Sequence, residues 1–351
     1  MLIHSRFKEY SVDFINSFEK VEELAKDKTT YFVVDNVVYN LYRQQLPNFD
    51  NDRLYLLHAV EVNKTIDTVL SICEKMTEMV SKRNTHLVSI GGGITQDITG
   101  FVATNLYRGI KWTFFPTTLL AACDSCIGGK SSLNYKGFKN LLGSFYPPDA
   151  IYILPNVFKT LSTKDYCSGL GEVVKFNIIA GDNGLGKIEQ TIDCLLNHDY
   201  KVLSEFIVSS LKFKKKFIEE DEFDKGIRVL LNFAHTFGHA FEVASNYEIP
   251  HGSAVALGMI TANDISVQRG FIDTAYAKRI ENVCEKILSN VALKKEWFEL
   301  DNIVTAIKKD KKQTDNIIKA VLIDSNHKLG VYGDIKATEI QKGLEHLLQV
   351  F

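Results

Sequence analysis

The residues that first suggest chemistry are two histidines, His235 and His239, which lie four residues apart in VLLNFAHTFGHAFEVA. In a helix this spacing places both rings on one face, and such pairs can bind zinc. Thr236 stands where zinc proteases of the H-E-x-x-H type carry a glutamate, so the motif does not indicate such a protease. Together with His251 in a P-H-G turn and a carboxylate such as Glu172 in GLGEVVKF, the histidines could form an open catalytic metal site. Surface or core histidines are the alternative interpretation.

A second candidate is the glycine run of HLVSIGGGITQDITGFVA, in which Gly91, Gly92 and Gly93 follow an apolar stretch and precede a helical pattern. A backbone that approaches a pyrophosphate closely needs glycine, and the helix that follows favours the phosphate charge. The strict G-x-G-x-x-G pattern is absent because Gln96 occupies the position of its third glycine. A tight structural turn therefore stays open as the alternative.

Cationic side chains form the third group. Lys175 follows Glu172 by one helical turn, and Lys130 follows a Gly-Gly pair after an apolar run, which suggests a phosphate cradle ending in a point charge. Most lysines in proteins are solvated, and that interpretation covers nearly all of the KFKKKF run. Other cations that stand beside small or polar residues are Arg108, Lys139, Lys214, Arg228, Lys311 and Lys312.

The composition is that of an ordinary soluble globular protein, because 45% of the 351 residues are hydrophobic and 24% are charged. The 41 basic and 43 acidic side chains give a net charge of −2, which argues against nucleic acid or an anionic membrane as the main partner. No apolar run approaches the roughly 20 residues that span a bilayer, and no signal-peptide pattern is seen. We therefore expect a cytoplasmic protein. Its six scattered cysteines, including the Cys123/Cys126 pair, fit reduced and buried thiols.

The elements that must position these residues follow from hydrophobic patterning. Short apolar runs at 31–35, 54–60, 86–90, 111–116 and 150–155 are interspersed with helical patterns such as 66–82. This alternation predicts a parallel sheet with crossover helices. From about residue 159 helical periodicity dominates, near 168–180, 201–219, 228–246, 251–269 and 274–289, with a hairpin at 317–323 and 329–333. The sequence thus predicts an α/β chain with a parallel-sheet domain over 1–157 and a mainly helical domain over 158–351.

The order and spacing of these blocks resemble the 3-dehydroquinate synthase family of sugar-phosphate cyclases. The resemblance covers nearly the whole chain, and it is carried by VVDNVV, EVNK, GGGITQDITGFVA, RGIKWTFFPTTLLAACDSCIGGK, GFKNLLGSF, GLGEVVKF, RVLLNFAHTFGHA, HGSAVALGM and KKDKK. It implies a homodimer whose Rossmann-like domain binds NAD and whose helical domain binds a divalent metal, Zn²⁺ or Co²⁺, with the active site in the cleft between the domains.

The resemblance also implies roles for single residues. The NAD-contacting positions are Asp35, Glu61, Lys64, Gly92, Gly93, Asp97, Thr117, Thr118 and Thr160. The metal ligands are Glu172, His235 and His251, whereas His239 becomes a substrate contact. The other substrate positions are Asp124, Lys130, Lys139, Asn140, Lys175, Lys214, Arg228, Asn232 and one of Lys311 and Lys312. Arg108 matches an arginine that reaches the neighbouring subunit's site.

The chemistry that the family implies explains these residue types. NAD removes hydride from 3-deoxy-D-arabino-heptulosonate 7-phosphate, phosphate leaves by β-elimination, hydride returns, and an intramolecular aldol reaction closes the carbocycle. A phosphate and a carboxylate at opposite ends of one sugar need several fixed cations. The resemblance assigns Lys130, Asn140, His239, Arg108 and the Lys311/Lys312 pair to the phosphate. It assigns Lys214 and Arg228 to the carboxylate.

Four positions depart from the family pattern, namely Gln96 and Ala234 in place of glycines, Cys126 in place of a serine and Ser253 in place of a glutamate. They suggest a divergent branch, and sister cyclases act on sedoheptulose 7-phosphate or glucose 6-phosphate, which carry no carboxylate. Lys214 and Arg228 favour the carboxylate substrate, because a neutral sugar would leave their charges uncompensated. An NAD-dependent alcohol dehydrogenase of the iron-containing type and a catalytically inactive binding protein are the alternatives from other classes.

Overall fold

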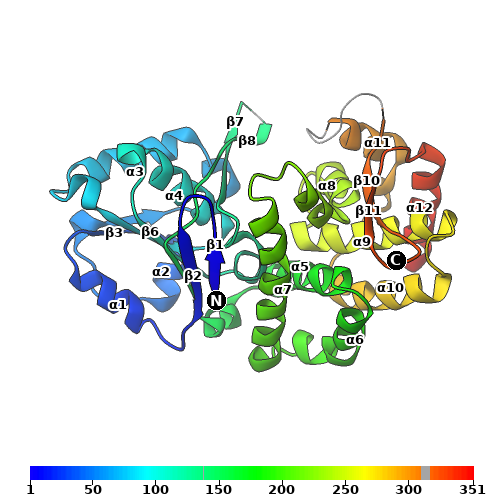
Figure 1. The fold of residues 1–351 in the computed structure, drawn as a ribbon, viewed down its shortest axis with the longest axis horizontal. Helices are drawn as coiled ribbons and strands as arrows, with labels where there is room; N and C mark the ends of the chain where they lie inside the picture. Colours follow the sequence, from blue (N-terminus) through cyan, green and yellow to red (C-terminus); the bar gives the residue numbers. More distant parts are fainter. Residues whose placement is uncertain (137, 310–316) are drawn as a thin grey trace. The chain divides into compact units, whose positions relative to one another are not determined.

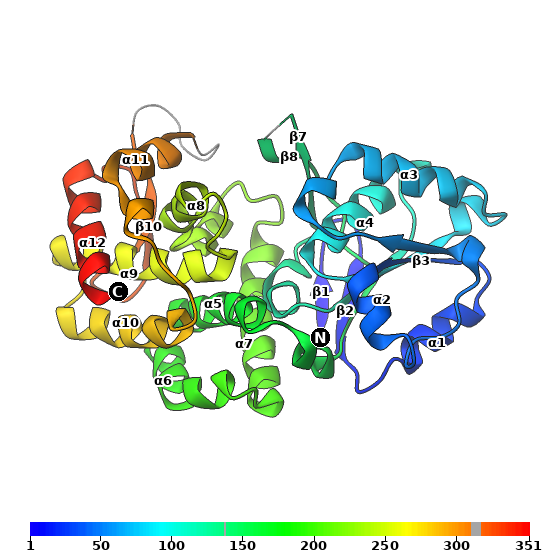
Figure 2. The same ribbon diagram turned by 180° about the vertical axis from the view of Figure 1, so that it is seen from behind.

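The chain is described by a computed structural model over residues 1–136, 138–309 and 317–351, and it divides into two compact units (Figures 1 and 2). The first unit holds residues 1–161 and 215–223, and the second holds 162–214 and 224–351. The first contains a largely parallel sheet and the second is mainly helical, which confirms the predicted α/β class. The expected boundary between residues 157 and 158 falls within a short 3₁₀ segment, η6 (Pro155–Thr160).

The sheet of the first unit has seven strands in the order β1-β2-β9-β6-β5-β3-β4. They are β1 (Leu2–His4), β2 (Glu9–Phe14), β3 (Thr30–Asp35), β4 (Leu54–Leu57), β5 (His86–Gly91), β6 (Trp112–Pro116) and β9 (Ala150–Ile153). All neighbouring pairs are parallel except β1 with β2. Every residue of β5 and β6 is buried, as expected for central strands that are covered on both faces.

The direction in which the sheet grows reverses at β3. The chain places β4 on one side of β3 and then returns to add β5, and after it β6, on the other side. Such a switch point leaves a crevice at the carboxyl ends of the strands, where ligands of open α/β sheets bind. The helices of this unit are α1 (Glu19–Lys26), α2 (Asn36–Tyr42), α3 (Ile66–Thr77) and α4 (Gly93–Asn105).

A separate hairpin follows the sheet's central strands. It consists of β7 (Lys130–Tyr135) and β8 (Phe138–Phe145), whose register shifts between Leu133 and Tyr135. The hairpin packs on α4, and a single π-helical turn, η5 (Ala121–Ser125), leads into it. The hairpin was not among the predicted strands: β7 is short and rich in polar residues, and no residue of β8 is buried.

The second unit is built around α9 (His251–Gln268), which is buried along most of its length. Helices α5 (Thr163–Ile179), α8 (His235–Ala244), α10 (Thr274–Leu288) and α12 (Ala337–Val350) all pack against it. Other elements are α6 (Asp182–Leu196), α11 (Leu300–Lys309) and the antiparallel pair β10 (Ala320–Ile323) and β11 (Leu329–Tyr332). That pair lies within the two segments for which a hairpin was predicted. Helix α7 (Tyr200–Glu220) is divided between the units, because its residues from 215 onward belong to the first. No helix among the described residues has the length and hydrophobicity of a membrane span.

Two predicted helices differ from the observed ones. The segment predicted as one helix over 228–246 is split into η7 (Ile227–Asn232) and α8, because Ala234 adopts a left-handed conformation with φ of +70°. The helix predicted over 66–82 ends at Thr77. The break at Ala234 matters for the site, since it makes His235 the first residue of α8.

We expect the buried His86 to make the first unit less stable in mild acid. Burial, and then the nearby Lys111 charge, lower the pKa of His86 to about 4, and its Nε2 lies 2.8 Å from the hydroxyl of Thr113. The unfolded chain, whose histidine has an ordinary pKa of 6.5, binds more protons between the two values. Stability is therefore lost as pH falls from about 6.5 to about 4, by roughly 2–3 kcal/mol. Urea unfolding at several pH values measures this change in the free energy of unfolding. In His86→Gln the free energy of unfolding should depend less on pH between about 6.5 and 4. The same pH dependence as in wild type would contradict the prediction.

Candidate active site

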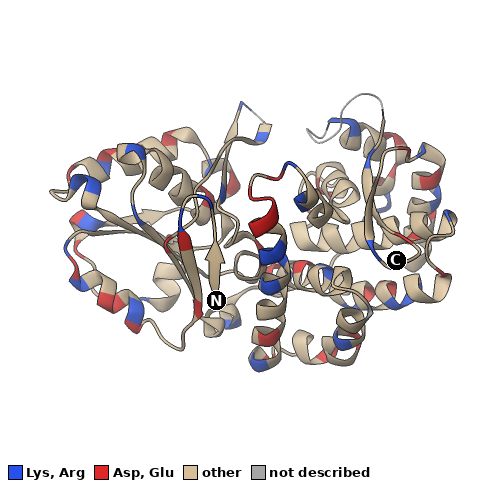
Figure 3. Ribbon diagram, viewed as in Figure 1, with Lys and Arg blue, Asp and Glu red and all other residues tan. Residues whose placement is uncertain are grey.

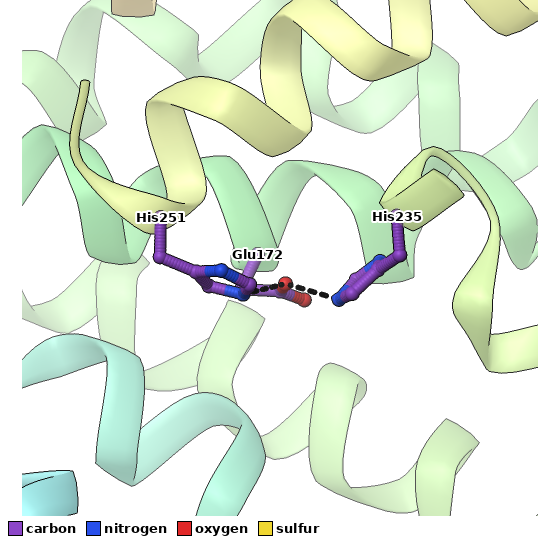
Figure 4. A group of neighbouring side chains, drawn as sticks. All are labelled: Glu172, His235 and His251. Carbon is purple, nitrogen blue, oxygen red and sulfur yellow. Dashed lines mark ion pairs between the residues drawn. The ribbon is translucent and has the colours of Figure 1, made fainter. Parts of the chain in front are cut away.

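A carboxylate and two imidazoles meet in the second unit. Glu172 projects from the middle of α5, and His235 and His251 are the first residues of α8 and α9. The Nε2 atoms of both histidines lie 3.3 Å from the same oxygen, Oε1 of Glu172. Figure 4 shows the two rings reaching the carboxylate from opposite sides.

These distances suit ligands around one cation. The edge of a tetrahedron is about 1.6 times its centre-to-corner distance, so zinc–nitrogen and zinc–oxygen bonds of about 2.0–2.1 Å place neighbouring ligands about 3.3–3.4 Å apart. One ligand atom from each residue lies within 4.8 Å of the others. The two nitrogen–oxygen separations therefore match those of a tetrahedral zinc site, and all three ligand atoms are close enough to share one ion.

The carboxylate of Glu172 is buried without conventional partners. Its exposed fraction is 0%, and within the described chain neither of its oxygens accepts a hydrogen bond of normal geometry. Lys175, 2% exposed, holds its Nζ 2.7 Å from Oε2 and donates to the carbonyl of Leu231 at 3.1 Å. Burial by itself raises the pKa of Glu172, but the charge of Lys175 and the approach of the two imidazoles outweigh it and hold that pKa well below its usual range. An ionised and otherwise unsatisfied carboxylate at this depth calls for a bound cation.

The pKa values of the two histidines shift in opposite directions. Burial, and then the charge of Lys175, lower the pKa of His235 to about 3. Burial also disfavours a charge on His251, but the carboxylates of Glu172 and Glu242 outweigh it and raise its pKa to about 10. Without a metal, a proton on His251 supplies positive charge between the two carboxylates, and a bound metal would displace that proton. The donor set of one carboxylate and two imidazoles, with these unsatisfied oxygens, fits a divalent metal such as zinc.

Close helix packing fixes where the three ligands lie. A Cβ built on Gly171 would lie 2.1 Å from the carbonyl oxygen of Gly252, and one on Gly252 would lie 1.7 Å from that of Ser168. Glycine at both positions therefore lets the backbones of α5 and α9 touch next to Glu172 and His251. In the same way, a Cβ on Gly258 would lie 2.2 Å from the carbonyl oxygen of Ala234, the residue before His235.

The other substrate contacts predicted among the described residues of the second unit lie on α7, η7 and α8. The ring centre of His239 is 5.3 Å from that of His235 and 5.9 Å from that of His251. Its nitrogens do not join the group around Glu172, although His239, Glu242 and His251 form a second set of neighbouring donor atoms. Lys214 on α7 and Arg228 on η7 are buried, with 6% and 4% exposed, and Asn232 ends η7. Lys311 and Lys312 lie outside the described residues.

In the first unit, predicted NAD residues gather at the switch point of the sheet. Asp35 ends β3 and caps α2 by accepting a hydrogen bond from the amide of Val37 at 2.8 Å. Gly92 and Gly93 follow β5 and begin α4. Thr117 and Thr118 follow β6, and the Thr117 amide donates to the carbonyl of Gly91 at 2.9 Å. All three strand ends lie at the carboxyl edge, where a dinucleotide phosphate would meet the amino end of α4.

Close contacts leave no room for a side chain at Gly91 or Gly92. A Cβ on Gly91 would lie 2.3 Å from the hydroxyl oxygen of Thr95, and one on Gly92 would lie 2.8 Å from a methyl carbon of Thr118. Gln96, which replaces a family glycine, points instead into the protein. Its amide donates to the carbonyl of Ser125 at 2.6 Å, and its carbonyl accepts from the Ser125 hydroxyl at 2.6 Å.

A buried ion pair joins the predicted NAD residues to the hairpin. Lys64 Nζ lies 3.0 Å from Asp97 Oδ2 and 2.5 Å from Asn140 Oδ1. Asp97 also accepts from the amide and the hydroxyl of Ser132, each at 3.0 Å. Burial raises the pKa of Asp97, against the opposing charge of Lys64. Asn140, predicted as a substrate contact, is thus held through its amide oxygen by a residue of the predicted NAD site.

The remaining predicted residues of this unit surround the hairpin or lie further along the chain. Glu61 accepts from the side chain of Asn134 at 2.8 Å and has Lys139 Nζ 3.9 Å away. Thr160 shares a 2.9 Å hydrogen bond with the hydroxyl of Tyr42. Asp124 lies in η5, Lys130 begins β7, and Arg108 is exposed before β6.

Two kinds of functional residue were absent from the predictions. Glu242, which contacts His251, lies seven residues after His235 on α8, so helical spacing alone could have placed it on the histidine face. Gly171 and Gly252 each lie next to a metal ligand in the sequence. A glycine within a helix does not show, from the sequence alone, that the backbone of another helix packs against it. The family pattern of a glycine before the first histidine is explained by the left-handed conformation of Ala234.

Comparison with known proteins gives the same family over both units. Models described as 3-dehydroquinate synthase N-terminal and C-terminal match residues 54–168 and 169–313. The chain is 37% identical over 289 residues to the 3-dehydroquinate synthase of Clostridium tetani, covering 81% of this chain and 78% of that protein.

Solved structures give the same fold. The structure of 2-epi-5-epi-valiolone synthase from Streptomyces hygroscopicus, with NAD⁺ and Zn²⁺ bound, matches with a TM-score of 0.86 at 24% identity over 99% of both chains. A 2-deoxy-scyllo-inosose synthase with carbaglucose-6-phosphate, NAD⁺ and Co²⁺ matches with a TM-score of 0.84, also at 24% identity over 99% of both chains.

Proposed function

The chain belongs to the 3-dehydroquinate synthase family, and we propose that it catalyses the reaction for which that family is named. This reaction is the NAD- and metal-dependent cyclisation of 3-deoxy-D-arabino-heptulosonate 7-phosphate to 3-dehydroquinate with release of phosphate, a carbon–oxygen lyase step of the shikimate pathway. The observation that carries the proposal is the group of Glu172, His235 and His251, with the buried Glu172 carboxylate at its centre.

Glu172, His235 and His251 would hold the metal, which polarises the substrate hydroxyls when bound. Lys175 keeps Glu172 ionised, because its Nζ lies 2.7 Å from the carboxylate in a site without water access to either side chain. Its second contact, with the Leu231 carbonyl, fixes the ammonium group in place. The Glu172 carboxylate is therefore ionised before any cation arrives, whereas His251 must release a proton when the metal binds.

Fixed cations would position the two charged ends of the substrate. Lys214 and Arg228 would bind its carboxylate, and they are buried where an unmatched charge is costly. The phosphate would be bound by Lys130, Asn140, His239, Arg108 and one of Lys311 and Lys312, and the further substrate contacts would be Asp124, Lys139 and Asn232.

NAD would occupy the carboxyl edge of the sheet in the first unit. The glycine turn and the amino end of α4 would face its phosphates, and Asp35 at the end of β3 would lie within the same crevice. The other positions proposed for NAD are Glu61, Lys64, Asp97, Thr117, Thr118 and Thr160.

A parallel assay tests the activity. Phosphate release is measured with catalytic NAD and zinc on 3-deoxy-D-arabino-heptulosonate 7-phosphate, sedoheptulose 7-phosphate and glucose 6-phosphate, and products are identified by mass. We expect turnover of the first substrate alone and no steady absorbance change at 340 nm, since NAD is regenerated. Turnover of either sugar phosphate that lacks a carboxylate would reassign the chain to a sister cyclase. Steady NADH production from an alcohol would indicate a dehydrogenase.

We further propose a cytoplasmic homodimer in which Arg108 completes the partner's site. Arg108 is exposed at the end of η4 (Leu106–Arg108), where Tyr107 and Arg108 both have positive φ, 52° and 67°, an uncommon backbone conformation for residues other than glycine. Mixing and refolding two inactive variants, Arg108→Ala and His235→Ala, should recover about a quarter of wild-type activity, because half of the dimers are mixed and each contains one intact site. No recovery from a mixture shown to contain mixed dimers would argue against a shared site.

A further inference from the structure

We propose that Glu242 is a positioning residue for His251: its carboxylate accepts a hydrogen bond from the ring and turns the opposite ring nitrogen toward the metal position. His251 Nδ1 lies 3.1 Å from Glu242 Oε2, and His251 Nε2 lies 3.3 Å from Glu172 Oε1. The inference rests on the metal site proposed above.

The two contacts of the His251 ring define its orientation. An ionised carboxylate can only accept a hydrogen bond, so the hydrogen shared with Glu242 belongs to Nδ1. In a neutral ring the lone pair is then on Nε2, the nitrogen that faces Glu172. A carboxylate behind a histidine ligand fixes the tautomer, holds the ring angle and makes the ligand nitrogen more basic.

The second histidine ligand is oriented by a different group. His235 Nδ1 lies 3.0 Å from the backbone carbonyl oxygen of Phe233, so its Nε2 also faces Glu172. A neutral carbonyl accepts a weaker hydrogen bond than a carboxylate. The two imidazoles thus differ, and His251 is the ligand strengthened by a charge.

The location of Glu242 on α8 makes this contact available. Together with His235 and His239, it lies on one helix face, since the three residues are spaced by four and then three positions. The backbone carbonyl of Glu242 separately closes the turn toward α9 by accepting from the amide of Tyr247 at 2.7 Å. A change of the side chain alone leaves that backbone bond in place, so ligand orientation can be tested apart from the turn.

The test compares zinc affinity across variants by competition with a chelating dye. For Glu242→Gln, which keeps the side-chain shape but loses the charge, we expect zinc to bind about 10-fold more weakly, and for Glu242→Leu up to about 100-fold more weakly. NAD affinity and the melting temperature of the metal-free protein should stay close to wild type. The visible absorption of bound Co²⁺ should change in both variants, because it reports ligand geometry.

The matched control is Glu248→Gln. Glu248 follows α8 in the chain, is exposed and pairs with Lys294 at 2.8 Å, so zinc affinity should not change. A zinc affinity of Glu242→Gln within twofold of wild type would overturn the inference, whatever Glu242→Leu does. More than one zinc per wild-type chain would also overturn it, since Glu242 would then be a ligand of a second ion with His239.

These outcomes separate the inference from the proposed metal site. If His235→Ala binds zinc as tightly as wild type, the site formed with Glu172 and His251 is wrong. If His235→Ala loses zinc and Glu242→Gln keeps it, the site stands and only the role of Glu242 fails.

Discussion

His235→Ala is expected to abolish stoichiometric zinc binding and to lower kcat by about 10³-fold or more, while the protein stays folded. The ring supplies one of three ligand atoms around Glu172, and two ligands rarely hold zinc in an open site. Loss of a metal that stabilises developing negative charge by several kcal/mol accounts for a rate effect of that size. Metal analysis after gel filtration and phosphate-release kinetics measure both quantities, and circular dichroism checks the fold.

The control for this variant is His346→Ala. His346 lies on α12 and contacts Glu281 rather than any residue of the metal group. It should keep zinc and activity at wild-type levels. A His235→Ala protein that turns over substrate at the wild-type rate without bound metal would show that the metal ligands are assigned wrongly.

Gly171→Ala and Gly252→Ala are each expected to destabilise the second unit by about 4 kcal/mol or more, above the usual range for an inserted methyl group. The new Cβ atoms would lie 2.1 Å and 1.7 Å from backbone carbonyl oxygens, which cannot rotate away as side chains can. Relief requires α5 and α9 to separate beside Glu172 and His251, so zinc affinity should fall as well. Calorimetry of the metal-free protein should show the transition of this unit lowered by roughly 10 °C.

Gly186→Ala, in the same unit, is expected to raise stability rather than lower it. Gly186 lies inside α6, and a Cβ there would meet no atom within 4 Å. Alanine should stabilise this helix by about 0.5–1 kcal/mol, because it has the higher helix propensity. If Gly171→Ala behaved like Gly186→Ala, the close approach of α5 and α9 would not be what positions the ligands.

The sequence predicted most of the parallel sheet correctly, because buried strands such as β3 carry a continuous apolar run, here YFVV. It did not predict the β7–β8 hairpin, whose pattern is irregular, or the break in the helix over 228–246. That break depends on Ala234, whose left-handed conformation is stabilised by its surroundings rather than by its own preference. Local propensity therefore located the elements but not the point at which α8 begins.

For the metal group, spacing alone offered His235 and His239 as an equivalent pair. The structure separates them: Nε2 of His235 approaches Glu172, whereas His239 is grouped with Glu242 and His251. Which ring faces the carboxylate depends on how α5, α8 and α9 pack, and that packing is set by contacts of glycines far apart in the sequence. The resemblance to the family distinguished the metal ligand His235 from His239, which periodicity could not do.

The confinement of Glu172, His235 and His251 to one unit has a consequence for tolerance to mutation. A metal that binds only the folded form adds stability by mass action, about 4 kcal/mol when free metal exceeds Kd a thousandfold. With metal bound, the second unit can therefore remain folded despite destabilising substitutions in its core, provided that they lie far from the ligands. The sheet unit, which carries none of the three ligands, gains no stability from the metal and would depend on NAD for the same effect.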